Sequence, residues 1–217
     1  MLYKKIAFCG LAMIGIVCSG IPVSVITPAQ AQSRTPGGHH AHAAGRLHRK
    51  PSVSTESGTV SLLLDRAYSA SLIKDLEHAQ HSIAILMYLF KPAGRTSALP
   101  DRIIGILARK RAEGVDVSVL LNVDEGQYGR GTMDTLKDTN LHTAQILEDN
   151  GIPVYLDSPH RTTHAKAVII DARIVYIGSH NFTRSALSYN HEVSVRIVSP
   201  AAARTLMDYL EAIKHEQ

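Results

Sequence analysis

The sequence contains no tryptophan, three phenylalanines and only two cysteines among its 217 residues. Both cysteines, Cys9 and Cys18, lie in an apolar amino-terminal segment that we predict is removed, which would leave a chain without thiols. Such a chain has no disulfide framework, no cysteine nucleophile and no thiolate ligand for a metal ion. The scarcity of aromatic rings also limits base stacking as a source of affinity for nucleic acids.

Residues 1–31 are predicted to be a secretory signal peptide. Lys4 and Lys5 give a basic start, residues 6–26 are mostly apolar, and Ala29-Gln30-Ala31 provides a small-residue cleavage signal. Cleavage would lower the formal net charge of +4 by two, so the remaining chain is only mildly basic. We therefore expect a periplasmic or secreted protein; a retained membrane anchor is the alternative, because the apolar run approaches spanning length.

Residues 32–58 have the composition of a flexible linker, with proline, glycine and serine and almost no large apolar side chain. The segment is rich in histidine and basic residues, namely His39, His40, His42, Arg46, His48, Arg49 and Lys50. A solvated tether is the simpler interpretation, because no carboxylate or thiol completes a metal site. Metal capture or contact with an anionic surface is the functional alternative.

From Thr59 to the carboxyl terminus, apolar runs and helical periodicities alternate, which predicts an α/β catalytic domain over residues 59–217. Strands are expected over 60–64, 83–90, 115–123, 152–156, 167–170, 174–177 and 191–198. Helices are expected over 69–80, 101–112, 132–149, 183–188 and 201–214. The domain should therefore be a mixed sheet of about seven strands flanked by helices.

Residues 164–181 form the most informative stretch, a predicted β-hairpin with polar ends. Its two apolar, largely β-branched runs are separated by a plausible turn at Asp171-Ala172-Arg173. Antiparallel pairing about that turn places residue i opposite roughly residue 343 minus i, so that Ser179 neighbours His164. The two-residue period of a strand puts His164 and Lys166 on the same face.

One end of this hairpin thus gathers groups suited to a phosphodiester. A neutral imidazole at His164 can attack phosphorus, while Lys166, Ser179 and Asn181 can stabilise charge on the non-bridging oxygens. The spacing resembles the HKD motif of the phospholipase D superfamily, H-x-K-x4-D-x6-G-S-x-N. All six specified positions are present, as His164, Lys166, Asp171, Gly178, Ser179 and Asn181.

The resemblance covers residues 59–214 and implies the α-β-α sandwich of that superfamily, with His164 as a nucleophile that forms a covalent phosphohistidine. The motif occurs once, as in the short secreted or periplasmic bacterial endonucleases of the superfamily. That pattern implies a homodimer with a shared active site, in which a second His164 protonates the leaving group. No cofactor and no metal are required by this scheme.

The roles of several residues in and near the motif can each be interpreted in two ways. Glu192 matches the acidic residue that orients the nucleophilic histidine in related nucleases, and the alternative is a solvated strand carboxylate. Asp171 belongs to the motif, yet its turn position favours a structural role. His164 by itself could be a core histidine, an alternative that the six-position match disfavours. For His180 we favour packing or a substrate contact over proton transfer.

The motif predicts the reaction class better than the substrate. A non-specific endonuclease on DNA or RNA is the first hypothesis, with phosphates tracked by Arg95, Arg109, Lys110, Arg111, Arg130, Arg161 and Arg184. The second is a phospholipase D that releases headgroups from phospholipids such as phosphatidylcholine, although no apolar acyl groove is evident. The third is a non-catalytic exported binding protein, which would have no need for His164.

Overall fold

The computed structural model describes residues 58–123, 136–158 and 161–215. Its strands are β1 (Thr59–Leu64), β2 (Ser82–Met87), β3 (Asp116–Leu121), β4 (Val154–Leu156), β5 (Lys166–Ile170), β6 (Ile174–Gly178) and β7 (Val193–Val198). Its helices are α1 (Arg66–His78), α2 (Leu99–Ala112), α3 (Leu136–Asp149), α4 (Arg184–Ser188) and α5 (Pro200–Lys214). The predicted signal peptide and all of the predicted linker except Gly58 lie outside the described residues.

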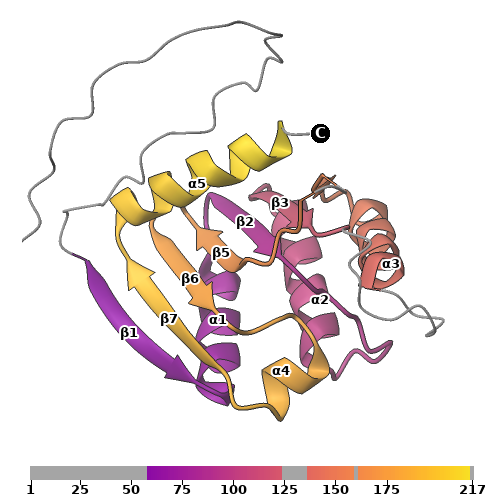
Figure 1. The fold of residues 1–217 in the computed structure, drawn as a ribbon, viewed down its shortest axis with the longest axis horizontal. Helices are drawn as coiled ribbons and strands as arrows, with labels where there is room; N and C mark the ends of the chain where they lie inside the picture. The colour runs from indigo at the N-terminus through magenta and orange to yellow at the C-terminus, as the bar shows by residue number, and fades with distance from the viewer. Residues whose placement is uncertain (1–57, 124–135, 159–160, 216–217) are drawn as a thin grey trace, which may run out of the picture. The chain divides into compact units, whose positions relative to one another are not determined.

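The strands form one mixed sheet in the order β1-β7-β6-β5-β2-β3-β4 (Figure 1). Strands β2, β3 and β4 are parallel, whereas β5, β6, β7 and β1 each pair antiparallel with their neighbour. The predicted mixed seven-stranded α/β sheet is therefore confirmed. Within the described ranges, no helix has the length and hydropathy needed to cross a membrane.

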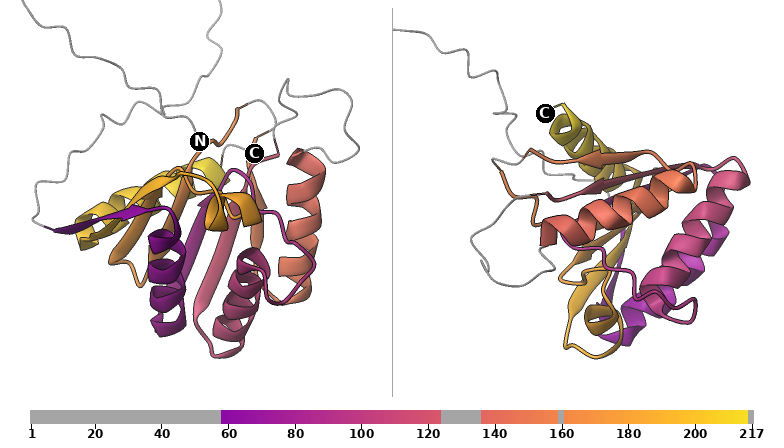
Figure 2. Two further views of the ribbon diagram at one scale, coloured as in Figure 1. Left: turned by 90° about the horizontal axis from the view of Figure 1, so that it is seen from below. Right: turned by 90° about the vertical axis from the view of Figure 1, so that its right-hand side faces the viewer.

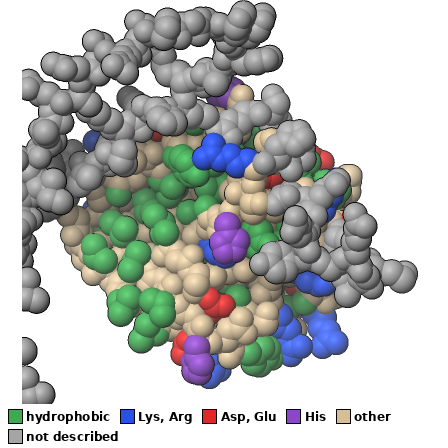
Figure 3. All heavy atoms as spheres, viewed as in Figure 1, with side chains coloured by type: hydrophobic (Ala, Val, Ile, Leu, Met, Phe, Trp, Pro, Cys, Tyr) green, Lys and Arg blue, Asp and Glu red, His purple; other side chains and the backbone are tan. Residues whose placement is uncertain are grey.

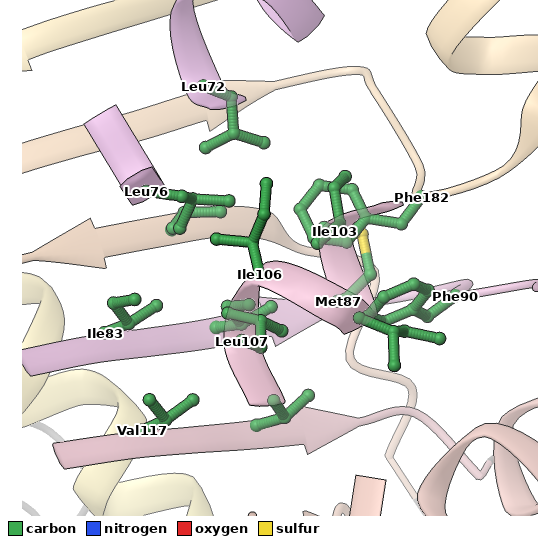
Figure 4. Packing of buried hydrophobic residues seen from close by; sticks show 14 of the residues in the cluster. Leu72, Leu76, Ile83, Met87, Phe90, Ile103, Ile106, Leu107, Val117 and Phe182 are labelled. Atoms are coloured by element: carbon green, nitrogen blue, oxygen red, sulfur yellow. The ribbon is translucent and has the colours of Figure 1, made fainter. Parts of the chain in front are cut away.

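The sheet is covered on both faces by helices, as expected for an α-β-α sandwich. Helices α1, α2 and α3 pack on one face, and α5 packs on the other (Figure 2). The larger core lies on the first face, where Leu72 and Leu76 of α1 and Leu107 of α2 meet Ile83 and Met87 of β2 (Figure 4). These side chains have at most 1% of their surface exposed. Such close packing makes the sheet rigid and holds the ends of its strands in fixed positions.

The hairpin β5–β6 confirms the predicted strands but corrects their register by one residue. Ala167 pairs with Ile177 and Ile170 with Ile174, so paired numbers sum to 344 rather than 343. The cause is a turn in which Asp171 and Ala172 both have positive φ, of 52° and 47°. The whole three-residue segment 171–173 therefore forms the loop, and Ser179 is not directly opposite His164.

The predicted alternation of β7 is confirmed, with its polar side chains turned inward. Ser194 is 2% exposed, and Arg196 Nε donates to Asp75 Oδ2 of α1 over 2.5 Å. The apolar residues Val193 and Val195 lie on the other face, where Val193 is exposed. Arg196 therefore holds α1, and Val193 contributes to the molecular surface.

Candidate active site

The predicted site lies along one edge of the sheet, where several strand ends meet. Met87 at the carboxyl end of β2 pairs with Lys166 at the start of β5. Gly178 at the end of β6 pairs with Ser194 near the start of β7. Residues that follow β2 and β6, and those that precede β5 and β7, are therefore brought together at this edge.

His164 and Lys166 flank the ring of Tyr88, the residue that follows β2. The imidazole of His164 meets that ring edge-on at a centroid distance of 4.5 Å, and Lys166 Nζ lies 4.6 Å from the ring centroid. Lys166 Nζ also donates to the His164 carbonyl oxygen over 2.7 Å. The backbone bond from Tyr88 N to Ala165 O, 3.0 Å, holds the three residues in register. Tyr88 thus contacts both groups and limits how their side chains can rotate.

The surroundings of His164 and Lys166 favour the neutral form of both side chains. Burial, and secondarily the charge of Lys166, lowers the pKa of the His164 imidazole below its ordinary value of 6.5. Burial also lowers the pKa of Lys166, while the carboxylate of Glu192 opposes that shift. An imidazole that stays neutral near pH 7 is available as a nucleophile.

Ser179 and Glu192 form a second pair at this edge. Ser179 Oγ donates a short hydrogen bond to Glu192 Oε2 and accepts one from Val193 N at 3.1 Å. Glu192 Oε1 accepts from Asn190 Nδ2 at 3.1 Å. A direct bond between Glu192 and the His164 ring, expected of an orienting carboxylate, is not among the hydrogen bonds of the described ranges. Glu192 therefore acts here on Ser179 and on the charge of Lys166, and its orienting role stays a prediction.

The rest of the G-S-x-N segment, Gly178 to Asn181, is closely packed. A Cβ atom at Gly178 would lie 2.0 Å from Ser194 Oγ, so this position excludes any side chain. His180 is 1% exposed and stacks on Tyr68 at a centroid distance of 4.1 Å, which supports the packing role. The buried Oδ1 of Asn181 has no hydrogen-bond partner in the described part of the chain, and the amide is therefore open to a further polar contact.

Asp171 is not brought together with the other predicted residues. Five residue steps along β5 separate it from Lys166, roughly 16 Å at the usual rise of a strand. Its carboxylate accepts hydrogen bonds from the backbone N–H groups of Gln80, His81 and Ser82, at 2.7–3.2 Å. The structure thus gives Asp171 the structural role that its turn position predicts, joining the hairpin to the start of β2.

Three residues of the predicted phosphate track lie away from the site. Arg111 Nε donates to Gly151 O, and Lys110 and Arg109 pair with Glu113, all near the start of β3 and so at the far end of the sheet. These three residues do not line the site. Arg184 comes three residues after the motif, and its guanidinium lies over the ring of Tyr189, 5.3 Å from its centroid. Arg130 lies outside the described residues.

Sequence reasoning missed Tyr88 and the polar core that holds it. Asn140 of α3 is fully buried; its Nδ2 donates to Tyr88 O and Asn122 O, and its Oδ1 accepts from Phe90 N. Asn122 Oδ1 in turn accepts from Thr163 N, next to His164. The only available signal was position, because Tyr88 and Asn122 follow strands directly, at the edge where α/β sheets usually bind ligands.

The chemistry available at this edge is that of an imidazole, an ammonium, a hydroxyl, an amide and a carboxylate. Among the residues that the structure describes, no three histidine, cysteine or acidic side chains are grouped so as to hold a metal ion. These groups can attack an electrophilic phosphorus, bind its anionic oxygens and exchange protons with it.

Comparison with known proteins agrees with this geometry. Residues 72–214 match the family described as "Cardiolipin synthase, PLD-like domain", and the chain belongs to this family. It is thus a member of the phospholipase D superfamily, whose members are phosphodiesterases. Among curated proteins it is similar to cardiolipin synthase A of Serratia proteamaculans (strain 568), with 28% identity over 113 residues. That match covers 51% of this chain and 22% of the relative, so this chain spans less than a quarter of the relative's length.

Two solved structures share the fold. Nuc from Salmonella typhimurium, described as a phospholipase D family member, is 23% identical with a TM-score of 0.58, covering 72% of this chain and 94% of that one. NucT from Helicobacter pylori is 19% identical with a TM-score of 0.53, covering 72% of this chain and 96% of that one. Both are short chains that the present domain matches almost from end to end.

Proposed function

We propose that this domain hydrolyses phosphodiester bonds, with His164 as the nucleophile and Lys166, Ser179 and Asn181 as the groups that bind the phosphate. The observation that carries the proposal is an exposed imidazole of lowered pKa beside a buried ammonium, both packed on Tyr88. The neutral imidazole supplies the lone pair, and the ammonium stabilises the negative charge that develops on the non-bridging oxygens.

The proposed reaction has two steps. In the first, His164 forms a bond to phosphorus while the bond to the leaving oxygen breaks, and a protonated imidazole gives that oxygen its proton. In the second, this imidazole, now neutral, takes a proton from water; the water oxygen attacks phosphorus, and the phosphorus–nitrogen bond breaks. One water is consumed, and an alcohol and a phosphate monoester leave. Neither step requires a metal ion.

The scheme needs two imidazoles, whereas the motif supplies one in each chain. We propose that the second is His164 of the partner subunit in a two-fold homodimer. A two-fold axis beside the site would bring two identical half-sites together and give each imidazole one of the two proton roles.

An apolar sheet face supports such a dimer. Val60, Leu62 and Leu64 of β1, Val193 of β7 and Ile177 of β6 are large hydrophobic residues with 42–64% of their surface exposed. Strand pairing aligns them on one face, which we call the open apolar face, and Figure 3 shows hydrophobic side chains gathered where Figure 1 draws these strands. The face reaches the site, since Val193 N donates to Ser179 Oγ. A second copy, docked by two-fold symmetry, would cover it.

Nucleic acid is the proposed substrate, and the enzyme is proposed to act as a non-specific endonuclease outside the cytoplasm. Support comes from the single motif and signal-like start, which resemble short exported nucleases. The nearly complete coverage of Nuc and NucT, against 22% of cardiolipin synthase A, points the same way. The similarity to cardiolipin synthase A favours the second candidate, hydrolysis of phospholipid headgroups.

Side-by-side assays distinguish the two substrates. The protein is incubated with plasmid DNA, RNA and phosphatidylcholine vesicles in the presence of EDTA, and His164→Asn serves as the control. We expect nicking and degradation of nucleic acid by the wild type only, with no headgroup release. Headgroup release without nucleic-acid cleavage would replace the first candidate by the second, and equal activity of His164→Asn would refute both.

A further inference from the structure

Asp65, between β1 and α1, has an unusual backbone conformation beside the candidate site. Its φ of 49° and ψ of −126° lie in a region that residues with a side chain rarely adopt. Aspartate at the residue before a helix normally accepts a hydrogen bond from the first turn, but the Asp65 side chain makes no such bond to α1. Its carboxylate is therefore not explained by helix capping.

The carboxylate of Asp65 is directed to Glu192 instead. Asp65 N donates to Glu192 O at 2.9 Å, and Asp65 Oδ1 accepts from Glu192 N at 3.0 Å. The two residues extend the β1–β7 ladder by one pair beyond Leu64 and Val193. In a regular antiparallel pair the second bond would go to the main-chain carbonyl, so the side chain of Asp65 replaces its own carbonyl.

The main-chain carbonyl of Asp65 is used elsewhere. It accepts from His180 Nε2 at 3.0 Å and from Tyr68 N at 3.2 Å. Because a carbonyl only accepts, the neutral His180 ring carries its proton on Nε2, and Nδ1 accepts from Ser194 Oγ at 2.7 Å. The positive φ thus lets one residue bind the buried histidine through its carbonyl and Glu192 through its carboxylate.

We propose that Asp65 is a positioning residue that holds Glu192, and through it Ser179, at the edge where the phosphodiester binds. The inference rests on the proposed function of that edge. Glu192 has both of its backbone polar groups on Asp65, and its carboxylate accepts from Ser179 Oγ. A smaller residue at position 65 would relieve the backbone strain, but it would also remove the acceptor for Glu192 N. This loss explains why the strained aspartate is retained.

Two substitutions separate this role from simple folding. Asp65→Gly adopts positive φ without strain and removes only the carboxylate, whereas Asp65→Asn also tolerates positive φ and keeps the Oδ1 acceptor. Ala172→Gly is the matched control, because it removes a positive-φ side chain at the opposite end of the sheet. Each full-length variant is assayed for kcat and KM on bis(4-nitrophenyl) phosphate, for thermal midpoint, and for hydrogen exchange of the Glu192 amide.

For Asp65→Gly we expect a thermal midpoint no lower than that of the wild type, a kcat lower by about ten- to a hundredfold, and faster exchange at Glu192. Asp65→Asn should restore kcat and amide protection, and Ala172→Gly should leave both unchanged. A kcat of Asp65→Gly within twofold of the wild type, or an unchanged exchange rate, overturns the proposal. If the wild type turns over no phosphodiester, the proposed function fails, and the exchange rates still decide whether Asp65 holds Glu192.

Discussion

The chemistry at His164 depends on a few neighbouring atoms rather than on the motif alone. The ring of Tyr88 lies against both the imidazole and the ammonium of Lys166, and burial disfavours charge on each. Lys166 also repels a proton on His164. The lowered pKa favours the neutral imidazole of His164 near pH 7, which is the form that the proposed nucleophilic role requires.

The lowered pKa of His164 gives a prediction for the pH dependence of activity. The neutral, nucleophilic form is present above the pKa, so kcat/KM should fall as the pH drops through a midpoint below 6.5. The pH–rate profile, compared with an NMR titration of the His164 ring, measures this midpoint. A loss of activity that is centred above 6.5 would contradict the assignment of His164 as the nucleophile.

At the scale of single residues, the sequence predicted the motif residues well and the residues around them poorly. The spacing from His164 to Asn181 identified five residues that the fold brings to one edge or packs beneath it, and Gly178 proves to need its small size. The sequence did not identify Tyr88 and Asp65, because their proximity to the site depends on which strands are neighbours in the sheet. That information comes from the pairings of β2 with β5 and of β1 with β7, which join residues about 80 and 130 positions apart.

Among the elements, the hairpin β5–β6 carries the motif and is held at both ends. The turn at its far end is closed by Arg173 N donating to Ile170 O at 3.1 Å, and both central residues have positive φ, as in a type I′ turn. Aspartate tolerates this conformation, and its carboxylate binds the segment before β2. Alanine at the next position does not tolerate it well.

Ala172→Gly should therefore stabilise the protein. Glycine removes the left-handed strain at φ 47°, and an Asp-Gly pair is favoured in this turn, although glycine also makes the unfolded chain more flexible. We expect a net gain of about 0.5–1 kcal/mol in the free energy of unfolding, with unchanged kcat. Urea denaturation of the variant and the wild type measures the difference; a loss of stability would mean that the turn does not have this conformation in solution.

The type of each element was more predictable than its position. Apolar periodicity predicted all seven strands, because helices bury most of the sheet and the uncovered face of β1 and β7 is also apolar. The register of the hairpin was wrong by one residue, because the positive φ of Asp171 and Ala172 cannot be read from their residue types. The inward direction of Arg196 and Ser194 also depends on distant partners, Asp75 of α1 for Arg196 and His180 for Ser194.

For the molecule as a whole, the open apolar face is the feature that a single copy leaves unexplained. Helix α5 covers the sheet over Val175 and packs on Ile197, whereas Leu62, Leu64 and Val193 remain exposed beyond it. The same edge carries the proposed half-site, to which each chain contributes one His164. A dimer through this face accounts for both observations at once.

A charge on the open apolar face should break the dimer. In a two-fold interface Leu62→Lys introduces its charge twice, so we expect the dimer dissociation constant to rise at least a hundredfold and activity to fall with it. Leu141→Lys is the control, since Leu141 is an exposed hydrophobic residue on α3, away from this face. Light scattering after size-exclusion chromatography reports the mass, and circular dichroism reports the fold.

Two results would refute the proposed dimer. One is a wild-type protein that is active as a monomer, and the other is a Leu62→Lys variant that remains dimeric and active. In the first case the apolar face needs another occupant, and the proton donor must be sought within one chain.

The most direct test of the central claim is to trap the intermediate at His164. The protein is mixed with 5′-labelled DNA, quenched with base within milliseconds to seconds, digested and mapped by mass spectrometry, since phosphohistidine survives base. We expect a nucleotide bound to His164, at no more than one per two chains, and none in His164→Asn. Steady turnover of DNA with no adduct at His164, or with the adduct on another residue, would contradict it.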